Sequence, residues 1–144
     1  MSYTRALAKV KVFTFGLLLA LVCLAGCAHG SDGARQAEST ANATIGAGYR
    51  ALNAYGNAEG KVVQEMARAG NPAGAQERLD ALKALTDKAF EVLDTASTSV
   101  DAMDAAIKVA EAARQKDYAT IIAKLLQIGT DVVTGLRTLG VKGL

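Results

Sequence analysis

Helical spacing of apolar residues runs through almost the whole chain after residue 40, and no other feature of the sequence constrains the fold as strongly. Residues at alternating steps of three and four lie on one face of an α-helix. The first such repeat runs through Ala41, Ile45, Gly48, Leu52, Tyr55, Glu59, Val62 and Met66. The β-branched pairs of the chain fall inside repeats of this kind, so the spacing predicts no strand and an all-α fold class.

Helix-ending residues divide this pattern into three long helices. The first extends from about residue 40 to the Gly-Asn-Pro sequence at residues 70–72. A glycine after the last apolar position and a following proline end one helix and begin the next. The second helix extends from that turn to about Gln115. Asp117 caps the third helix, which ends at Gly140.

The second helix has the most regular apolar stripe and one open question. Its stripe runs through Ala75, Leu79, Leu82, Leu85, Ala89, Leu93 and Ala96. The hydroxyl-rich residues 95–99 favour a break, and Thr98 with Asp101 matches a capping box. Val100 and Met103 nevertheless continue the same stripe. We expect a continuous or gently kinked helix, and a break near residues 95–99 is the alternative.

Four glycines weaken the first helix. Gly46, Gly48, Gly56 and Gly60 each cost up to about 1 kcal/mol relative to alanine inside a helix. The first half of this helix therefore frays or depends on packing. Gly56 and Gly60 also form a GxxxG step, which lets two helices approach closely. Two interpretations are open: a close contact within the bundle, or an exposed docking groove.

The connections and the composition together predict the architecture. Short connections at residues 70–72 and 115–117 make successive helices antiparallel neighbours, so we expect an up-down bundle of three long helices, or of four if the second is broken. After the N-terminal segment the aromatic residues are Tyr49, Tyr55, Phe90 and Tyr118. With so few aromatics and much alanine, the core is thin. A thin core favours coiled-coil-like self-association, because a second copy would cover stripes that one chain leaves exposed.

The first 27 residues follow a different pattern. A basic segment with Arg5, Lys9 and Lys11 is followed at once by an apolar run over residues 12–25, and no acidic residue precedes Asp32. As a helix this run would rise roughly 21 Å, short of the roughly 30 Å that a membrane span must cross. These are the positive and apolar regions of a signal peptide.

The apolar run ends on Leu24-Ala25-Gly26-Cys27, where the segment resembles the signal peptide of bacterial lipoproteins. The resemblance implies cleavage between Gly26 and Cys27 and two or three acyl chains on Cys27. Such an anchor is effectively irreversible. Ala28 at the next position is similar to an outer-membrane sorting signal, which implies a protein facing the periplasm, or the cell exterior where the host has one membrane. The alternative is an uncleaved N-terminal anchor helix.

The signal and the helical pattern divide the chain into four parts. These are a signal peptide at residues 1–26, a lipidated cysteine and flexible tether at 27–39, a helical bundle domain at 40–140 and a tail at 141–144. The tether is expected because its residues include glycine and serine and show no apolar period.

Removing the signal changes the charge and the thiol content. Residues 1–26 hold three of the 16 basic residues and none of the 14 acidic ones, so 13 basic and 14 acidic residues remain. Both signs are interspersed, which excludes the positive face that a nucleic-acid partner needs. Cys23 leaves with the signal and the sulfur of Cys27 carries lipid. No thiol is then left for a disulfide, a metal site or a nucleophile.

Acidic residues on the second helix are the nearest approach to a metal site. They are Asp87, Glu91, Asp94, Asp101 and Asp104. Lys83, Lys88 and Lys108 lie among them and no EF-hand spacing is present, so we interpret them as a solvated face. His29, the single histidine, lies two residues after Cys27 without a placed catalytic partner. We therefore predict no catalytic residue, no metal and no cofactor.

The expected function is that of a non-enzymatic, lipid-anchored helical protein of the cell envelope. It acts through protein–protein contacts or as a structural component, with a second copy or an envelope protein as partner. The alternative is a small membrane-active lipoprotein, toxin-like or lysis-type, that uses its amphipathic last helix. That helix, from Tyr118 to Leu139, is strongly apolar and carries Lys124 and Arg137 on its polar side. Burial of its stripe against the first two helices is the arrangement we expect.

Overall fold

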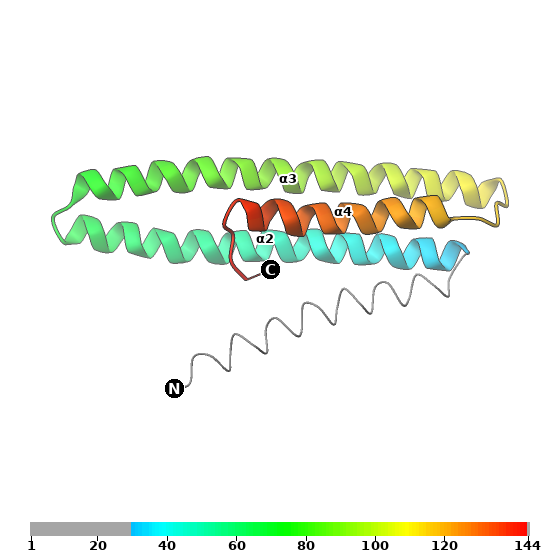
Figure 1. Cartoon of the computed structure of the whole chain (residues 1–144), viewed down its shortest axis with the longest axis horizontal. Helices are drawn as coiled ribbons and strands as arrows, with labels where there is room; N and C mark the ends of the chain where they lie inside the picture. The colour runs from blue at the N-terminus through cyan, green and yellow to red at the C-terminus, as the bar shows by residue number, and fades with distance from the viewer. Residues whose placement is uncertain (1–29, 144) are drawn as a thin grey trace, which may run out of the picture.

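The computed structural model describes residues 30–143, and within them the chain forms three α-helices that lie side by side (Figure 1). Helix α2 is Ser31–Arg68, helix α3 is Pro72–Ala112 and helix α4 is Ala119–Thr138. Successive helices run in opposite directions, and each helix contacts the other two. The predicted all-α class and the antiparallel up-down topology are confirmed.

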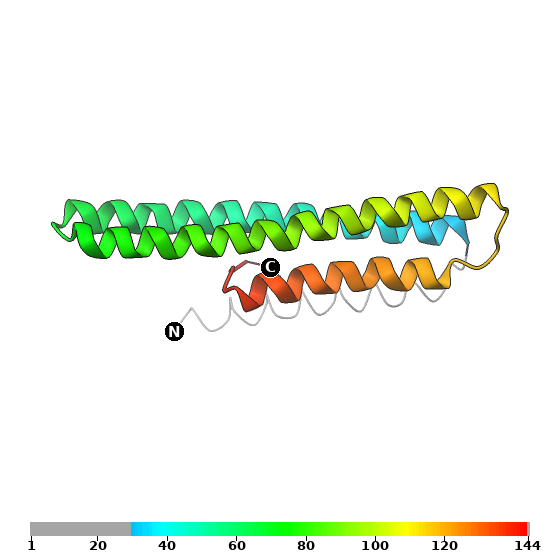
Figure 2. The ribbon, with the colours of Figure 1, turned by 90° about the horizontal axis from the view of Figure 1, so that it is seen from above.

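Helix α4 is about half as long as its two neighbours. It has 20 residues, against 38 in α2 and 41 in α3. It therefore rises roughly 30 Å where α2 rises roughly 57 Å. It packs along the end of the rod that holds the start of α2 and the end of α3 (Figure 2). We call that part the three-helix half, and we call residues 53–90, where α2 and α3 run without α4, the distal hairpin.

The prediction of a flexible tether up to residue 39 is wrong for residues 31–39. Helix α2 already begins at Ser31, and Ala34 and Ala37 in its first turns are buried in the core. These alanines continue the stripe that begins at Ala41, at steps of three and four. Because their side chains are small, they bury little area each and give no clear hydropathy period, yet they let the other helices approach closely.

Helix α3 continues without a break through residues 95–99, so the four-helix alternative is wrong. The hydroxyl groups that favour a break are satisfied inside the helix. Thr98 Oγ1 donates to the carbonyl of Asp94 at 3.0 Å, and Ser99 Oγ donates to the carbonyl of Thr95 at 2.8 Å. Bonds of this kind let serine and threonine remain in a helix that tertiary packing stabilises.

The residues predicted at the turn between α2 and α3 end the first helix and begin the second. At the hairpin turn Gly70 has a φ of 81°, in the left-handed region that favours glycine. Asn71 Oδ1 then accepts a hydrogen bond from the backbone N–H of Gly74 at 3.0 Å, which caps α3. At the start of α4 the N-cap is Tyr118, one residue later than the predicted Asp117, although Asp117 Oδ1 does accept a hydrogen bond from the backbone N–H of Ala119 at 2.9 Å.

Two helix ends differ from the prediction. Helix α3 ends at Ala112, rather than near Gln115, because Arg114 has a φ of 53° and the backbone then folds back onto the carbonyl of Ala110. After α4, the backbone of Val141 likewise bonds back to the last turn, and its side chain is 3% exposed. Residue 141 therefore belongs to the core and not to the predicted tail.

The core is thin and lies in the three-helix half. The largest fully buried side chains are Leu93, Val100, Ile107, Leu125, Val132 and Leu136. Gly48 brings the helices together there, because a Cβ atom at this position would come within 2.7 Å of Leu93 Cδ2 and 2.9 Å of Leu136 Cδ1. The sequence left two possibilities for the first half of α2, fraying or dependence on packing. The structure shows it packed against the other helices.

Candidate functional site

The residues with the strongest sequence signal lie outside the described part of the chain. Gly26 and Cys27, predicted for cleavage and lipidation, and His29 all precede residue 30. The lipid anchor therefore stays a prediction. The early start of α2 does bear on it, because only residues 28–30 separate Cys27 from Ser31. A segment of this length spans at most roughly 14 Å, so an anchor on Cys27 would hold the start of α2 close to the membrane.

The predicted acidic row on α3 does not come together as a metal site. Asp94 accepts a hydrogen bond from Tyr49, and Asp104 forms ion pairs with Arg35 and Lys108. The other three acids are exposed: Asp87, Glu91 and Asp101. Among the described residues, no group of three His, Cys, Asp or Glu side chains is placed to hold a metal ion. These acids act as separate surface charges.

An ion-pair network joins the start of α2 to the end of α3. Arg35 Nη1 donates to Asp104 Oδ1 at 2.6 Å and to Glu38 Oε2 at 3.1 Å, and Arg35 Nη2 donates to Glu111 Oε2 at 2.8 Å. The bonds to Glu111 and Asp104 raise the pKa of Arg35. Arg35 in turn holds the pKa of Glu111 below its ordinary value, and Lys108 together with Arg35 lowers the pKa of Asp104. The network links the first turns of α2 to the last turns of α3 on the surface of the rod.

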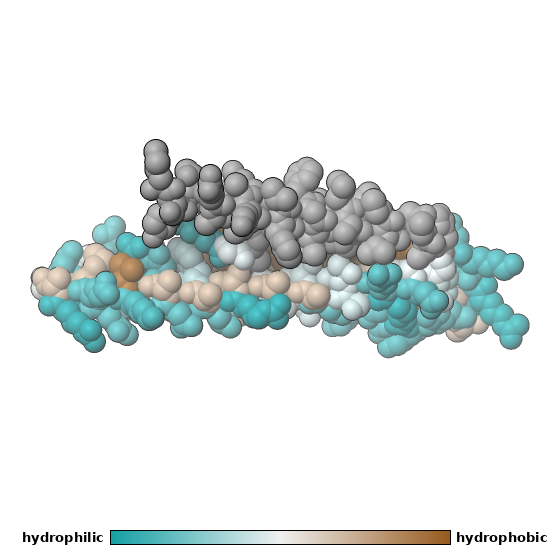
Figure 3. All heavy atoms as spheres, turned by 90° about the horizontal axis from the view of Figure 1, so that it is seen from below, coloured by the Kyte–Doolittle hydropathy of each residue, from teal (hydrophilic) through white to brown (hydrophobic). Residues whose placement is uncertain are grey.

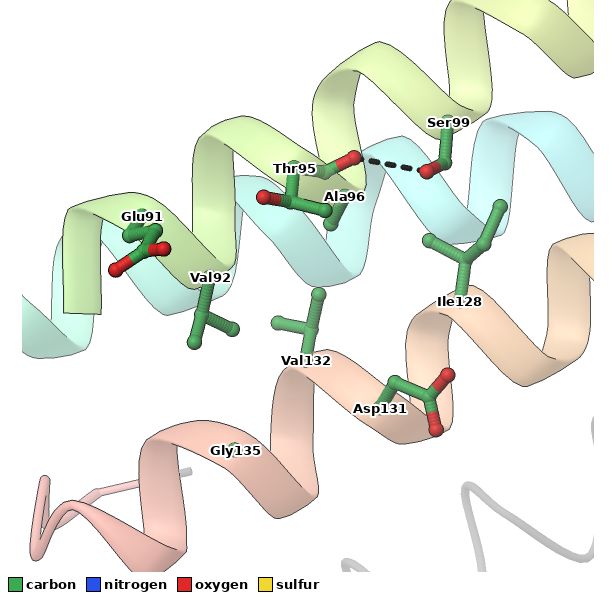
Figure 4. Close-up of a pocket in the computed structure, with 9 residues that line it drawn as sticks. All are labelled: Glu91, Val92, Thr95, Ala96, Ser99, Ile128, Asp131, Val132 and Gly135. Atoms are coloured by element: carbon green, nitrogen blue, oxygen red, sulfur yellow. Dashed lines mark hydrogen bonds between the residues drawn. The ribbon is translucent and has the colours of Figure 1, made fainter. Parts of the chain in front are cut away.

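A groove of about 350 Å³ lies between α3 and α4 (Figure 4). It is lined by Glu91, Val92, Thr95, Ala96, Ser99, Ile128, Asp131, Val132 and Gly135. At Gly135 the two helices come close, since a Cβ atom there would lie 3.1 Å from Val92 Cγ1. Val92 and Val132 form apolar walls, while the carboxylates of Glu91 and Asp131 lie at the rim. The groove offers a small apolar contact area flanked by negative charge.

Two large apolar side chains of α3 are exposed on the side of the hairpin away from α4. Phe90 lies two residues before Val92, hence about 200° around the helix, so it points away from the groove that Val92 lines. Leu79 lies about three turns before Phe90 and shares its side. Leu79 is 45% exposed and Phe90 is 39% exposed. Leu79 belongs to the apolar stripe of the sequence, but a hairpin of two helices cannot cover its side chain.

Helix α2 contributes an aromatic residue and two glycines to the same side. The rings of Tyr49 and Phe90 have centroids 6.0 Å apart, and the Tyr49 hydroxyl donates to Asp94 Oδ1 at 2.7 Å, which raises the pKa of Tyr49. Gly56 and Gly60 follow Tyr49 at steps of seven and four, on the same helix face. A Cβ atom at either glycine would meet no atom within 4 Å. The close contact within the bundle that the GxxxG step suggested is therefore not made there.

We call this set of residues the back face of the hairpin: Tyr49, Gly56, Gly60, Leu79 and Phe90. The ion pair between Arg78 Nε and Glu59 Oε2, at 2.7 Å, ties the two helices together beside it and lowers the pKa of Glu59. The sequence left an exposed docking groove open as one interpretation of Gly56 and Gly60, but it did not indicate that Leu79 and Phe90 are exposed. The available signal was the short third stripe, which cannot cover two helices of twice its length.

Helix α4 is, among the described residues, the one helix long and apolar enough to cross a membrane by length and composition. Its buried side chains are Ile122, Leu125, Val132 and Leu136. They belong to the core cluster that also contains residues of α2 and α3. Its opposite side exposes polar groups such as Lys124 and Arg137. The expected packing of its stripe against the other two helices is what the structure shows.

The chain matches none of the protein families, curated proteins or solved structures with which it was compared. The surfaces described above are therefore the features from which a function can be inferred. They are the Arg35 network, the groove between α3 and α4, and the uncovered back face of the hairpin.

Proposed function

We propose that this chain is a non-enzymatic, lipid-anchored protein of the bacterial cell envelope that acts through protein–protein contacts. Cys27 carries the lipid, in the outer membrane, and the bundle faces the periplasm. The observation that carries the proposal is the distal hairpin: α4 leaves this part of the rod uncovered, and large apolar side chains there are exposed. An exposed apolar surface bordered by polar residues is typical of a contact site.

The distance between the anchor and the distal hairpin supports this role. The start of α2 follows Cys27 by only a few residues. Leu79 lies at about the height of Gly60, because each lies eleven residues toward the hairpin turn from the contacting rings of Phe90 and Tyr49. Residue 60 is roughly 44 Å along α2 from Ser31 at about 1.5 Å per residue. A rod held at one end would thus present its exposed apolar residues well away from the lipid, where another protein can reach them.

The chemistry of the described surfaces also favours contact over catalysis. The groove between α3 and α4 has walls of Val92, Ala96 and Val132, and the hydroxyl of Ser99 beside it donates to a backbone carbonyl. General acid-base or nucleophilic chemistry needs a nucleophile hydrogen-bonded to a base. The groove instead supplies packing surface, as the back face does.

A second candidate, a membrane-active lipoprotein that uses α4, is favoured by the length and apolar composition of Ala119–Thr138. Membrane binding through this helix would require its apolar stripe to leave the core. Leu125 is 1% exposed and Leu136 is 0% exposed, so the stripe is engaged by α2 and α3. The packed arrangement supports the first candidate.

The test is intact mass and membrane fractionation of the expressed full chain. Cys27→Ser is the variant, and Cys23→Ser, which changes a cysteine inside the signal, is the matched control. We expect the wild type and Cys23→Ser to lose residues 1–26, gain lipid mass and sediment with membranes, whereas Cys27→Ser stays unprocessed. If Cys27→Ser is processed and lipidated like the control, the lipoprotein assignment fails. Leakage of dye-filled vesicles on addition of the purified wild type would favour the second candidate.

A further inference from the structure

We propose that the back face of the hairpin binds a second copy of this chain, in a parallel two-fold dimer in which Leu79 of each copy sits over Gly56 and Gly60 of the other. The inference rests on the proposed function in one respect: two copies anchored in the same membrane point the same way. A two-fold interface uses the same patch on both copies, so that patch must be complementary to itself.

The heights of the residues along the rod meet this requirement. The rings of Tyr49 and Phe90 are in contact, with centroids 6.0 Å apart, so these two residues lie at similar heights. Because α2 and α3 are antiparallel, eleven residues further toward the hairpin turn lead to Gly60 on α2 and to Leu79 on α3, which therefore lie at similar heights too. A two-fold axis parallel to the rod makes α2 of one copy face α3 of the other at the same height. Leu79 of one copy then faces Gly60 of the second copy, and the reverse contact forms at the same time.

The shapes also fit. Leu79 projects from α3 with 45% of its surface exposed. Opposite it, Gly56 and Gly60 leave open space, because a Cβ atom at either position would meet nothing within 4 Å. Glycine is unfavourable inside a helix, and among residues 30–143 no neighbouring side chain or backbone approaches the open side of Gly56 or Gly60. A leucine of one helix seated between small residues of another is the knob-into-hole arrangement of packed helices.

The polar residues at the edges of the back face are complementary as well. On α2, Asn53 and Asn57 lie beside the two glycines. On α3, Asp80 and Asp87 lie beside Leu79. All four side chains are exposed. On this register Asn53 lies opposite Asp87 of the second copy, and Asn57 lies within about two residues of Asp80 of the second copy, roughly 3 Å along the rod. Amide groups donate to carboxylates, so these contacts are favourable. Residues 53–90 also contain five acidic and five basic residues, so two hairpins carry no net charge against each other.

Figure 3 shows the α2 side of the rod, where weakly hydrophobic side chains run in a row from the hairpin end between hydrophilic ones. Helix α3, which carries Leu79 and Phe90, lies behind α2 in this view. Two hairpins would form four helices in the distal part, in which Tyr49 and Phe90 of each copy extend the contact. The second copy thus supplies the packing that α4 supplies in the three-helix half.

The test is disulfide cross-linking of the full chain in bacterial membranes. Two differently tagged copies, Gly60→Cys and Leu79→Cys, are expressed together, each with Cys23→Ser, and the membranes are oxidised mildly. We expect a linked heterodimer from the pair and at least tenfold less linked product from either copy alone, because identical residues lie diagonally across the four helices. The matched control is Val109→Cys with Gly60→Cys, since Val109 is 69% exposed on α3 but lies in the three-helix half.

The outcomes separate this proposal from the lipid anchor. Lack of the Gly60–Leu79 heterodimer, or an equal yield with Val109→Cys, overturns the dimer. A strong disulfide between two Leu79→Cys copies contradicts the parallel arrangement, in which Leu79 of one copy lies over the glycines of the other. A linked dimer of the unsubstituted chain instead means that Cys23 or Cys27 keeps a free thiol. That result contradicts the lipid anchor and leaves the proposed dimer unaffected.

A second variant tests the contact between Leu79 and Gly60 of the second copy without introducing a cysteine. Gly60→Gln places a helix-favouring side chain in the open space, so the helical content of the chain should not fall. The long side chain blocks the seat of Leu79, so sedimentation of the detergent-extracted full chain should change from dimer to monomer. Ala58→Gln, at an exposed position two residues before Gly60 and therefore about 200° around α2 from it, should stay dimeric. A Gly60→Gln dimer as tight as that of the wild type contradicts the proposal.

Discussion

Gly48 of α2 lies directly against Leu93 of α3: a Cβ atom on residue 48 would come within 2.7 Å of Leu93 Cδ2. Two residues earlier, a Cβ atom on Gly46 would meet only the side chain of Arg50, at an ordinary contact distance of 3.6 Å. Two glycines one half-turn apart therefore have different reasons to be present. Packing requires the first, while nothing near the second excludes a side chain.

We expect Gly48→Ala to destabilise the bundle and Gly46→Ala to stabilise it. Alanine gains up to about 1 kcal/mol over glycine inside a helix at both positions. At residue 48 the added methyl group must displace Leu93, which is 0% exposed. Overpacking of this kind costs about 1–3 kcal/mol, which outweighs the gain. Thermal unfolding followed by circular dichroism measures both variants, and equal stabilisation by the two would contradict the close approach.

The Arg35 network makes stability depend on acidic pH. In the folded chain the pKa values of Asp104 and Glu111 lie below their ordinary values, because Arg35 and Lys108 favour the charged carboxylates. Groups with a lowered folded pKa contribute stability above the ordinary pKa, and this contribution is lost as the pH falls through the folded pKa. Arg35→Gln should therefore be less stable than the wild type near neutral pH, with a shallower loss of stability below about pH 5.

The matched control for that prediction is Arg50→Gln, which removes an exposed arginine from the same helix. Its melting temperature should follow that of the wild type across the same acid titration. If Arg35→Gln and the wild type lose stability in parallel as the pH falls, the ion pairs of Arg35 do not govern the acid response. High salt should also reduce the difference between Arg35→Gln and the wild type, because these pairs are accessible to solvent.

The hairpin turn depends on Asn71. Its Oδ1 accepts the backbone N–H of Gly74 at 3.0 Å, one of the donors that the start of α3 leaves without a helical partner. Asn71→Ala should lower the free energy of unfolding by about 1 kcal/mol. Asn71→Asp keeps the acceptor and adds a negative charge at the helix start, so it should be at least as stable as the wild type. Urea unfolding compares the two, and equal loss in both would show that the cap contributes nothing.

Sequence spacing predicted α3, α4 and the turn at residues 70–72 because large apolar side chains and strong helix-ending residues mark them. It missed the start of α2, where Ala34 and Ala37 are buried without contributing a hydropathy signal. It also missed the Arg35 network, since Asp104 and Glu111 lie 69 and 76 positions away along the chain. Such pairs exist only once the helices are brought together.

The exposure of the back face was missed for a related reason. A stripe shows which side of a helix is apolar, but it does not show how far a third helix reaches along it. Leu79 lies on the predicted apolar stripe of α3 and is nevertheless 45% exposed. The GxxxG step at Gly56 and Gly60 was visible, but whether a helix of the same chain fills it depends on tertiary structure. The anchor at Cys27, which precedes the described residues, rests on the N-terminal pattern alone and stays a prediction.

Leu136→Ala tests whether α4 is a core helix. Leu136 is 0% exposed and would contact any side chain placed at Gly48, so its truncation leaves a cavity between α2, α3 and α4. Removing a buried leucine in this way costs about 2–5 kcal/mol. Leu139→Ala, at a half-buried position one turn later, is the matched control and should cost less than half as much. A Leu136→Ala variant that unfolds at the wild-type temperature would mean that α4 does not hold the bundle together in solution, and its apolar stripe would then be available to a membrane.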